Sequence, residues 1–122
     1  MPTTTITICD TCRFSEAEKI GPDGLTGGEM LAEQVERLAE ARPELEVRRV
    51  SCLMGCERHC NMAVSAPGKL TYVLGRFSPE VASAEAIIAY SELHRGSEMG
   101  RVPFKQWPDG VKGHFIARIP PV

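Results

Sequence analysis

The first hydrophobic segment of the chain consists largely of β-branched residues. Residues 3–8 read TTTITI, a composition that favours an extended strand, and this segment runs directly into Cys9. Residues 45–50 (LEVRRV) have a similar character and deliver the chain to Cys52. The pattern therefore predicts two strands, each of which ends close to a cysteine.

The residues between these strands follow a helical pattern. Apolar side chains recur at positions i, i+4 and i+7 (Leu31, Val35 and Leu38). Thr26, followed three residues later by Glu29, has the form of a capping box, so we predict a helix over residues 27–42. A helical crossover makes the strands that it joins parallel, and parallel strands end at the same edge of a sheet.

The next segments predict a hairpin and a second helix. Residues 62–65 and 70–74 flank the turn sequence Ala-Pro-Gly-Lys, which is typical of a hairpin connection. A serine followed by proline and glutamate then marks the start of a helix, predicted over residues 79–95. His94, near the end of this helix, is expected to complement the helix dipole.

The order strand, helix, strand, hairpin, helix predicts an α/β domain with a mixed sheet and two main helices. This domain is expected to span residues 1–95. Residues 96–122 are richer in aromatic side chains, and we predict that they form a C-terminal extension that wraps the domain. A length of 122 residues fits one core of this kind.

Composition and charge narrow the possible partners. The chain has 14 basic and 16 acidic side chains and a net charge of −2, which argues against nucleic-acid binding driven by bulk charge. No apolar stretch approaches the ~18 residues of a membrane span, and residues 1–8 lack the features of a signal peptide. We therefore expect a cytoplasmic protein with no nucleic-acid or membrane partner.

The cysteines carry the clearest chemical signal in the chain. The sequence has five of them, in two groups: Cys9 and Cys12, then Cys52, Cys56 and Cys60. Disulfides do not persist in a reducing compartment, so clustered cysteines there indicate metal or redox chemistry. Because both predicted strands end at one edge, the two groups are expected to converge.

Two resemblances can be stated from these residues. The segment Cys52-Leu53-Met54-Gly55-Cys56, with Cys9 at the end of the first strand, resembles the thioredoxin-like [2Fe–2S] ferredoxins over about residues 3–95. Nearly the whole chain, including the closing sequence ARIPP at residues 117–121, is similar to a small bacterial family of predicted metal-binding proteins of unknown function.

The ferredoxin resemblance implies a thioredoxin-like fold and a [2Fe–2S] cluster that moves one electron at a time. The chain would then be an electron carrier or a redox accessory protein with a redox partner protein, and not an enzyme by itself. Similar ferredoxins often form homodimers. Members of the similar bacterial family are sometimes encoded near cobalamin-synthesis genes, which implies service to cobalamin metabolism.

The resemblance also implies a ligand set. Cys9, Cys52 and Cys56 match ferredoxin ligand positions, and Cys12 would be the fourth ligand, although those ferredoxins have a longer loop before their second cysteine. Cys60 would then be a spare or substitute ligand. The set formed by Cys9, Cys52, Cys56 and Cys60 is the competing assignment.

Residues beside the cysteines could support such a cluster. Two ferric ions, two sulfides and four thiolates carry a net charge of −2, so backbone N–H groups and cations nearby stabilise them. Gly55 would let the backbone approach the sulfurs, and Arg13, Arg58 and His59 are adjacent candidates for positive charge. Arg13 and Arg58 could equally be solvated, and His59 could replace one cysteine as a ligand.

Two alternatives use the same cysteines. Zinc binds four thiolates, and Cys9 and Cys12 have the spacing most common in zinc knuckles, which would make the chain a metal-handling protein without redox activity. A third possibility is a dithiol redox protein that uses Cys9 and Cys12, because thioredoxins carry their redox pair at the same place after a strand.

Overall fold

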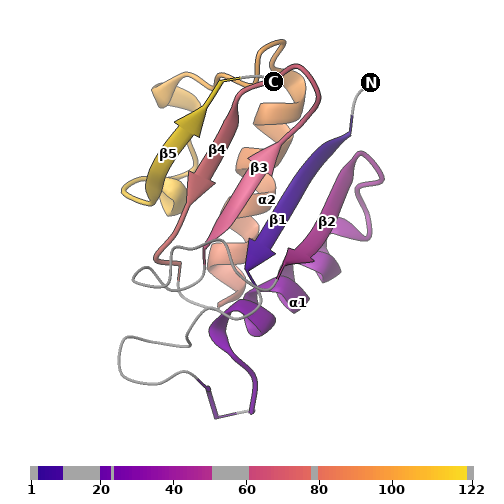
Figure 1. Cartoon of the computed structure of the whole chain (residues 1–122), viewed down its shortest axis with the longest axis vertical. Coiled ribbons are helices and arrows are strands. Elements are labelled where there is room, and N and C mark those ends of the chain that lie inside the picture. The colour runs from indigo at the N-terminus through magenta and orange to yellow at the C-terminus, as the bar shows by residue number, and fades with distance from the viewer. Residues whose placement is uncertain (1–2, 10–19, 23, 51–60, 78–79, 121–122) are drawn as a thin grey trace.

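The strands form one five-stranded sheet in the order β2-β1-β3-β4-β5 (Figure 1). The computed structural model describes residues 3–9, 20–22, 24–50, 61–77 and 80–120. Its strands are β1 (Thr4–Cys9), β2 (Leu45–Val50), β3 (Met62–Ser65), β4 (Thr71–Leu74) and β5 (Phe115–Ile119). Its α-helices are α1 (Gly27–Ala39) and α2 (Val81–Gly96), and two short 3₁₀ turns at Phe104–Gln106 and Asp109–Val111 precede β5.

The parallel pair predicted from the sequence is confirmed. β1 and β2 run parallel, in a register that begins at Thr4 opposite Leu45 and ends at Cys9 opposite Val50. The crossover helix α1 starts with the predicted capping box, in which the Glu29 backbone N–H donates to Thr26 Oγ1 at 3.1 Å. The helix ends at Ala39, three residues earlier than predicted.

The predicted hairpin is also confirmed, and the sheet then gains a strand that the sequence pattern does not predict. β3 and β4 pair antiparallel with Met62 opposite Leu74, and Met62 also lies opposite Ile8 of β1. β5 pairs antiparallel with β4. Residues 115–119, assigned to the C-terminal extension, are therefore an integral strand at the edge of the sheet.

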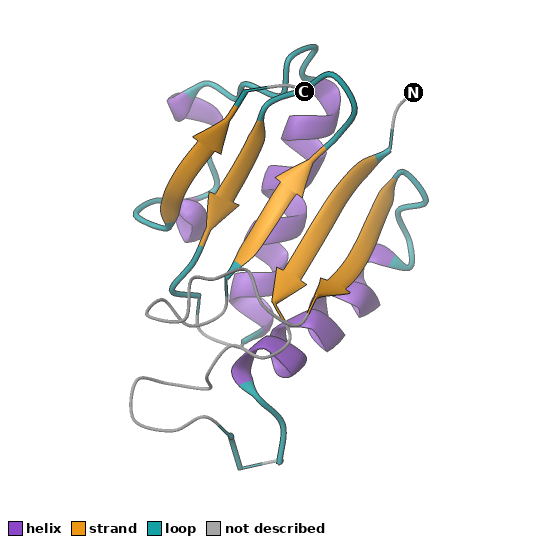
Figure 2. Cartoon of the chain, viewed as in Figure 1, coloured by secondary structure: helices purple, strands orange, loops and turns teal. Residues whose placement is uncertain are grey.

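Both helices pack on the same face of the sheet, so the described residues form a two-layer mixed α/β domain (Figure 2). The core lies between the layers and includes Ile6, Ile8, Leu31, Val35, Ile87 and Tyr90. Helix α2 begins at Val81, so Glu80, expected in its first turn, is instead the residue before the helix. The capping serine and the first helical residue predicted at positions 78 and 79 lie outside the described residues. None of the described helices combines the length and apolar character that a membrane crossing requires.

The last turn of α2 corrects the role predicted for His94. This side chain is fully buried, and its Nε2 donates to the Leu70 carbonyl at 2.8 Å, while Thr4 Oγ1 lies 3.5 Å from Nδ1. Lys69 instead occupies the helix terminus, because its Nζ donates to the carbonyls of His94 at 3.1 Å and Arg95 at 2.7 Å. The lysine, contributed by the hairpin, complements the helix dipole, and the histidine is a core residue.

We expect the buried imidazole to make the protein less stable in mild acid. Burial, together with the charge of Lys69, lowers the pKa of His94 below its ordinary value of 6.5. Below about pH 6.5 the His94 imidazole therefore binds a proton in the unfolded chain but not in the native chain. The free energy of unfolding should fall by up to about 1.4 kcal/mol per pH unit, until the pH reaches the lowered native pKa.

Urea unfolding at several pH values, for the parent and for His94→Gln, measures this contribution. Glutamine keeps an N–H donor for the Leu70 carbonyl but does not titrate. The parent should lose stability more steeply than the variant between pH 6.5 and pH 5. Equal slopes for the two proteins would show that the imidazole is not held neutral.

Candidate metal centre

The candidate centre lies at the sheet edge where β1 and β2 end. Cys9 lies opposite Val50 of β2 on one side, and on its other side its backbone N–H donates to the Asn61 carbonyl at 3.0 Å. Asn61 directly precedes β3. The chain therefore leaves the sheet at Val50 on one side of β1 and returns at Asn61 on the other side. The arrowheads of β1 and β2 mark this edge in Figure 1.

Most of the predicted site residues lie outside the described residues. These are the cysteines Cys12, Cys52, Cys56 and Cys60 and the neighbouring residues Arg13, Gly55, Arg58 and His59. Of the predicted ligands, the structure describes Cys9. Within the described ranges, no group of three or more His, Cys, Asp or Glu side chains could hold a metal ion.

The thiol of Cys9 is buried in a way that the strand pattern does not explain. Side chains alternate between the two faces of β1, which places Cys9 on the same face as Thr5 and Thr7, opposite the helices. Those threonines are half-buried, whereas Cys9 is 3% exposed. The first predicted ligand thus lies in a buried environment at the end of its strand.

Sequence reasoning missed two side chains at this same edge, Arg76 and His114. β4 ends with Leu74 opposite Met62, so residues 75 and 76 follow at the edge where β1 ends. His114 directly precedes β5 and returns the chain to this edge, and its carbonyl accepts from the Gly75 N–H at 2.9 Å. Antiparallel pairing of β3, β4 and β5 therefore brings both side chains to the side of the sheet where the cysteine segments depart.

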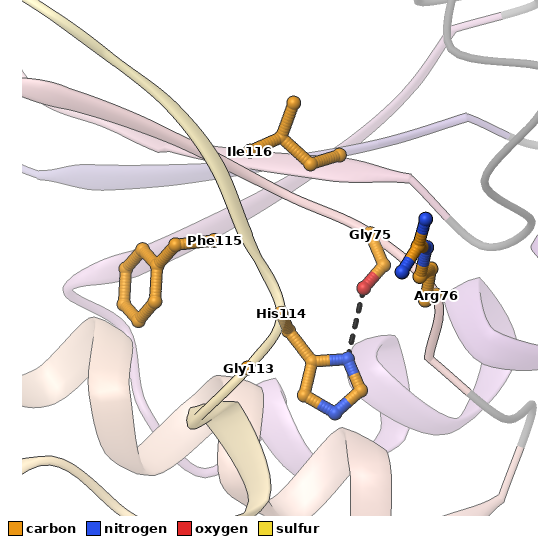
Figure 3. Close-up of a pocket in the computed structure, with 6 residues that line it drawn as sticks. All are labelled: Gly75, Arg76, Gly113, His114, Phe115 and Ile116. Carbon is orange, nitrogen blue, oxygen red and sulfur yellow. Dashed lines mark hydrogen bonds between the residues drawn. The ribbon is translucent and has the colours of Figure 1, made fainter.

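The imidazole of His114 is held in one orientation (Figure 3). Its Nδ1 donates to the Gly75 carbonyl at 2.8 Å, since a carbonyl can only accept. Its ring stacks on the buried ring of Phe77, with centroids 4.4 Å apart and planes 5° from parallel. The hydrogen bond therefore selects the tautomer in which Nδ1 carries the hydrogen and Nε2 the lone pair.

Arg76 lies on the other side of the Gly75 carbonyl in the same view (Figure 3). Its φ of +64° is in the left-handed region, which costs a residue other than glycine about 1–2 kcal/mol. Among the described residues, no carboxylate lies within ion-pair distance of its guanidinium. Arg76 and His114 line a polar cavity of about 220 Å³ with Gly75 and Gly113.

These features define a two-layer α/β protein with a cysteine, a cation and an oriented imidazole along one edge of its sheet. A family model described as "Protein of unknown function (DUF1636)" matches residues 6–121, and the chain belongs to this family. No curated protein and no solved structure matches the chain significantly. The family assignment agrees with the similarity to a small family of unknown function seen in the sequence.

Proposed function

We propose that this protein binds a [2Fe–2S] cluster at the edge where β1 and β2 end and acts as an electron carrier or redox accessory protein. The observation that carries the proposal is the pairing of Cys9 with Val50 on one side and Asn61 on the other. All three cysteines of the second group lie between Val50 and Asn61 in the sequence. The described residues that flank this segment, Val50 and Asn61, therefore lie on either side of Cys9.

Chain connectivity supports the convergence of the two cysteine groups. Adjacent strands lie about 4.8 Å apart, so Val50 and Asn61 flank the end of β1 with a separation of roughly 10 Å. Cys52 follows Val50 by two residues and Cys60 directly precedes Asn61. Consecutive Cα atoms are about 3.8 Å apart, so connections of one or two residues would allow both cysteines to approach Cys9.

The proposed ligands are Cys9, Cys12, Cys52 and Cys56, with Cys60 beside the cluster as a substitute ligand. The chemistry of the donor set fits, because iron–sulfur clusters are held by cysteine thiolates. Gly55, Arg13, Arg58 and His59 are proposed to stabilise the negative cluster through backbone approach and positive charge.

Arg76 supplies a further positive charge at this edge, and it lies within the described residues. β4 lies two strand spacings from β1, or roughly 10 Å. At that distance a unit positive charge attracts a unit negative charge on the cluster by about 1–2 kcal/mol at an effective dielectric constant near 20. The attraction is weaker once salt screens an exposed guanidinium. Arg76 would therefore adjust the reduction potential of the cluster without being essential for its binding.

A thioredoxin-like fold is part of the proposal. The described topology supports it: a βαβ unit with parallel strands, followed by an antiparallel hairpin and a helix, with both helices on one face. This is the arrangement that the ferredoxin resemblance implies. β5 would then be an addition at the edge of that core.

The burial of Cys9 favours a metal ligand over a dithiol redox pair. An attacking thiolate must be accessible to its partner disulfide, whereas Cys9 is 3% exposed. Zinc is the competing metal, because the same four thiolates suit a tetrahedral zinc site.

The proposal also extends the sequence resemblance to location and partners. It includes a cytoplasmic location, a redox partner protein, a homodimer and a role beside a corrinoid enzyme.

Reductive titration of anaerobically purified protein tests the proposed activity. Dithionite should bleach the visible absorption with about one electron per chain, and the reduced protein should give the paramagnetic signal of a one-electron-reduced cluster. The control is the Cys9→Ser variant, which should lack both the colour and the signal. A protein that takes up no electrons, or that takes up about two through a dithiol, contradicts the proposal.

A further inference from the structure

We propose that a groove beside β5, whose lining includes none of the predicted cysteine ligands, binds a small organic anion with a flat apolar body. The groove is a cavity of about 340 Å³ between the β4–β5 pair and the segment that follows α2. Pockets for small molecules begin near ~300 Å³, so this volume suits a ligand of one or two rings. An aromatic wall and two arginines line this groove.

The wall is formed by three aromatic side chains that hold one another in place. The Trp107 ring lies 4.4 Å from the Phe115 ring at a tilt of 31°, and Tyr72 meets Phe115 edge to face at 5.8 Å. The indole Nε1 donates to the Val102 carbonyl at 2.9 Å, which fixes the orientation of Trp107. The wall is therefore ordered before a ligand binds, so little conformational entropy is lost on binding.

Arg101 and Arg118 supply positive charge to the same groove. Both side chains line it and both are exposed. Arg118 lies opposite Tyr72 in the β4–β5 register, so it shares a face with the aromatic wall. Within the described part of the chain, neither guanidinium has a carboxylate at ion-pair distance. Two uncompensated guanidiniums beside stacked rings favour a carboxylate or phosphate group attached to a planar body.

A second copy of the chain fits this groove less well than a small anion does. A twofold contact through the groove would bring Arg101 and Arg118 of each copy towards those of the other. Like charges that face one another are unfavourable, and no described acidic side chain lines the groove to offset them. The charge of the groove therefore favours an anion over self-association.

The chain provides a direct reporter for this site. Trp107 is the only tryptophan in the sequence, so a nitrogen-15-labelled sample has a single indole N–H resonance. Titration with 2-naphthoate should shift that resonance saturably. The neutral 2-naphthalenemethanol has the same ring system without the charge, and it should bind at least ten times more weakly.

Substitution of Arg101 and Arg118 tests whether these two side chains recognise the carboxylate of the probe. Arg101→Gln combined with Arg118→Gln should weaken 2-naphthoate binding at least tenfold, while the remaining resonances keep their positions and show that the fold is retained. Arg48→Gln, an exposed arginine on the opposite edge strand β2, is the matched control and should bind as the parent does.

The proposal is overturned if the indole resonance does not respond, if the neutral probe binds equally well, or if the resonance shifts with protein concentration alone. Loss of the cluster in a Cys9→Ser variant should leave naphthoate binding intact, so the two proposals fail separately.

Discussion

Replacing Gly100 by alanine is expected to destabilise the protein by about 2–5 kcal/mol. Gly100 has φ +81°, and a Cβ atom there would lie 2.6 Å from His94 Nε2 and 3.1 Å from Lys69 Cβ. His94 cannot move aside freely, because it is fully buried and bonded to the Leu70 carbonyl. The expected loss combines about 1–2 kcal/mol for the left-handed backbone with about 1–3 kcal/mol for overpacking.

Gly68→Ala is the matched control for this prediction. Gly68 has a similar φ of +73°, but nothing lies within 4 Å of the Cβ position. This variant should lose only the backbone contribution of about 1–2 kcal/mol. Urea unfolding followed by Trp107 fluorescence compares the two variants. Equal losses in both would mean that the close approach of Gly100 to His94 does not contribute to stability.

The second large effect is the loss of the cluster on removal of one ligand. With the proposed set, Cys12→Ser should lose most of its bound iron, whereas Cys60→Ser should keep its iron and its visible spectrum. The physical reason is that a [2Fe–2S] cluster takes four protein ligands, so the fifth cysteine is dispensable. Cys9→Ser should lose the cluster whichever set is right.

The reverse result would identify the competing set. If Cys60→Ser loses the cluster while Cys12→Ser keeps it with an unchanged spectrum, the ligands are Cys9, Cys52, Cys56 and Cys60. Cys60 is the alternative fourth ligand because it directly precedes Asn61 in the chain, and the Asn61 carbonyl accepts from the Cys9 backbone N–H. Iron content and absorption spectra of anaerobically purified variants decide between the two sets.

Local patterns were sufficient to predict the central part of the fold. The β-branched run of β1, the capping box at Thr26 and Glu29, and the turn between β3 and β4 each act over a few residues, and each was found in its predicted place. β5 was not predicted, because its five residues lie between glycine- and proline-containing segments and their pairing with β4 depends on contacts distant in sequence.

The difference between local patterns and contacts distant in sequence also explains which side chains the sequence did not place at the candidate site and at the end of α2. Cys9 was placed correctly at the end of a strand, since that follows from local sequence. The positions of Arg76 and His114 depend on the antiparallel register of β4 and β5. The exchange of roles between His94 and Lys69 depends on tertiary packing that buries the imidazole and brings the hairpin to the end of α2.

Elemental analysis of the anaerobically purified protein tests whether the cysteine edge of this sheet holds a [2Fe–2S] cluster. We expect a brown protein with about two iron and about two sulfide ions per chain and little zinc. A colourless protein with about one zinc ion per chain and no acid-labile sulfide would contradict it and would identify a four-thiolate zinc protein.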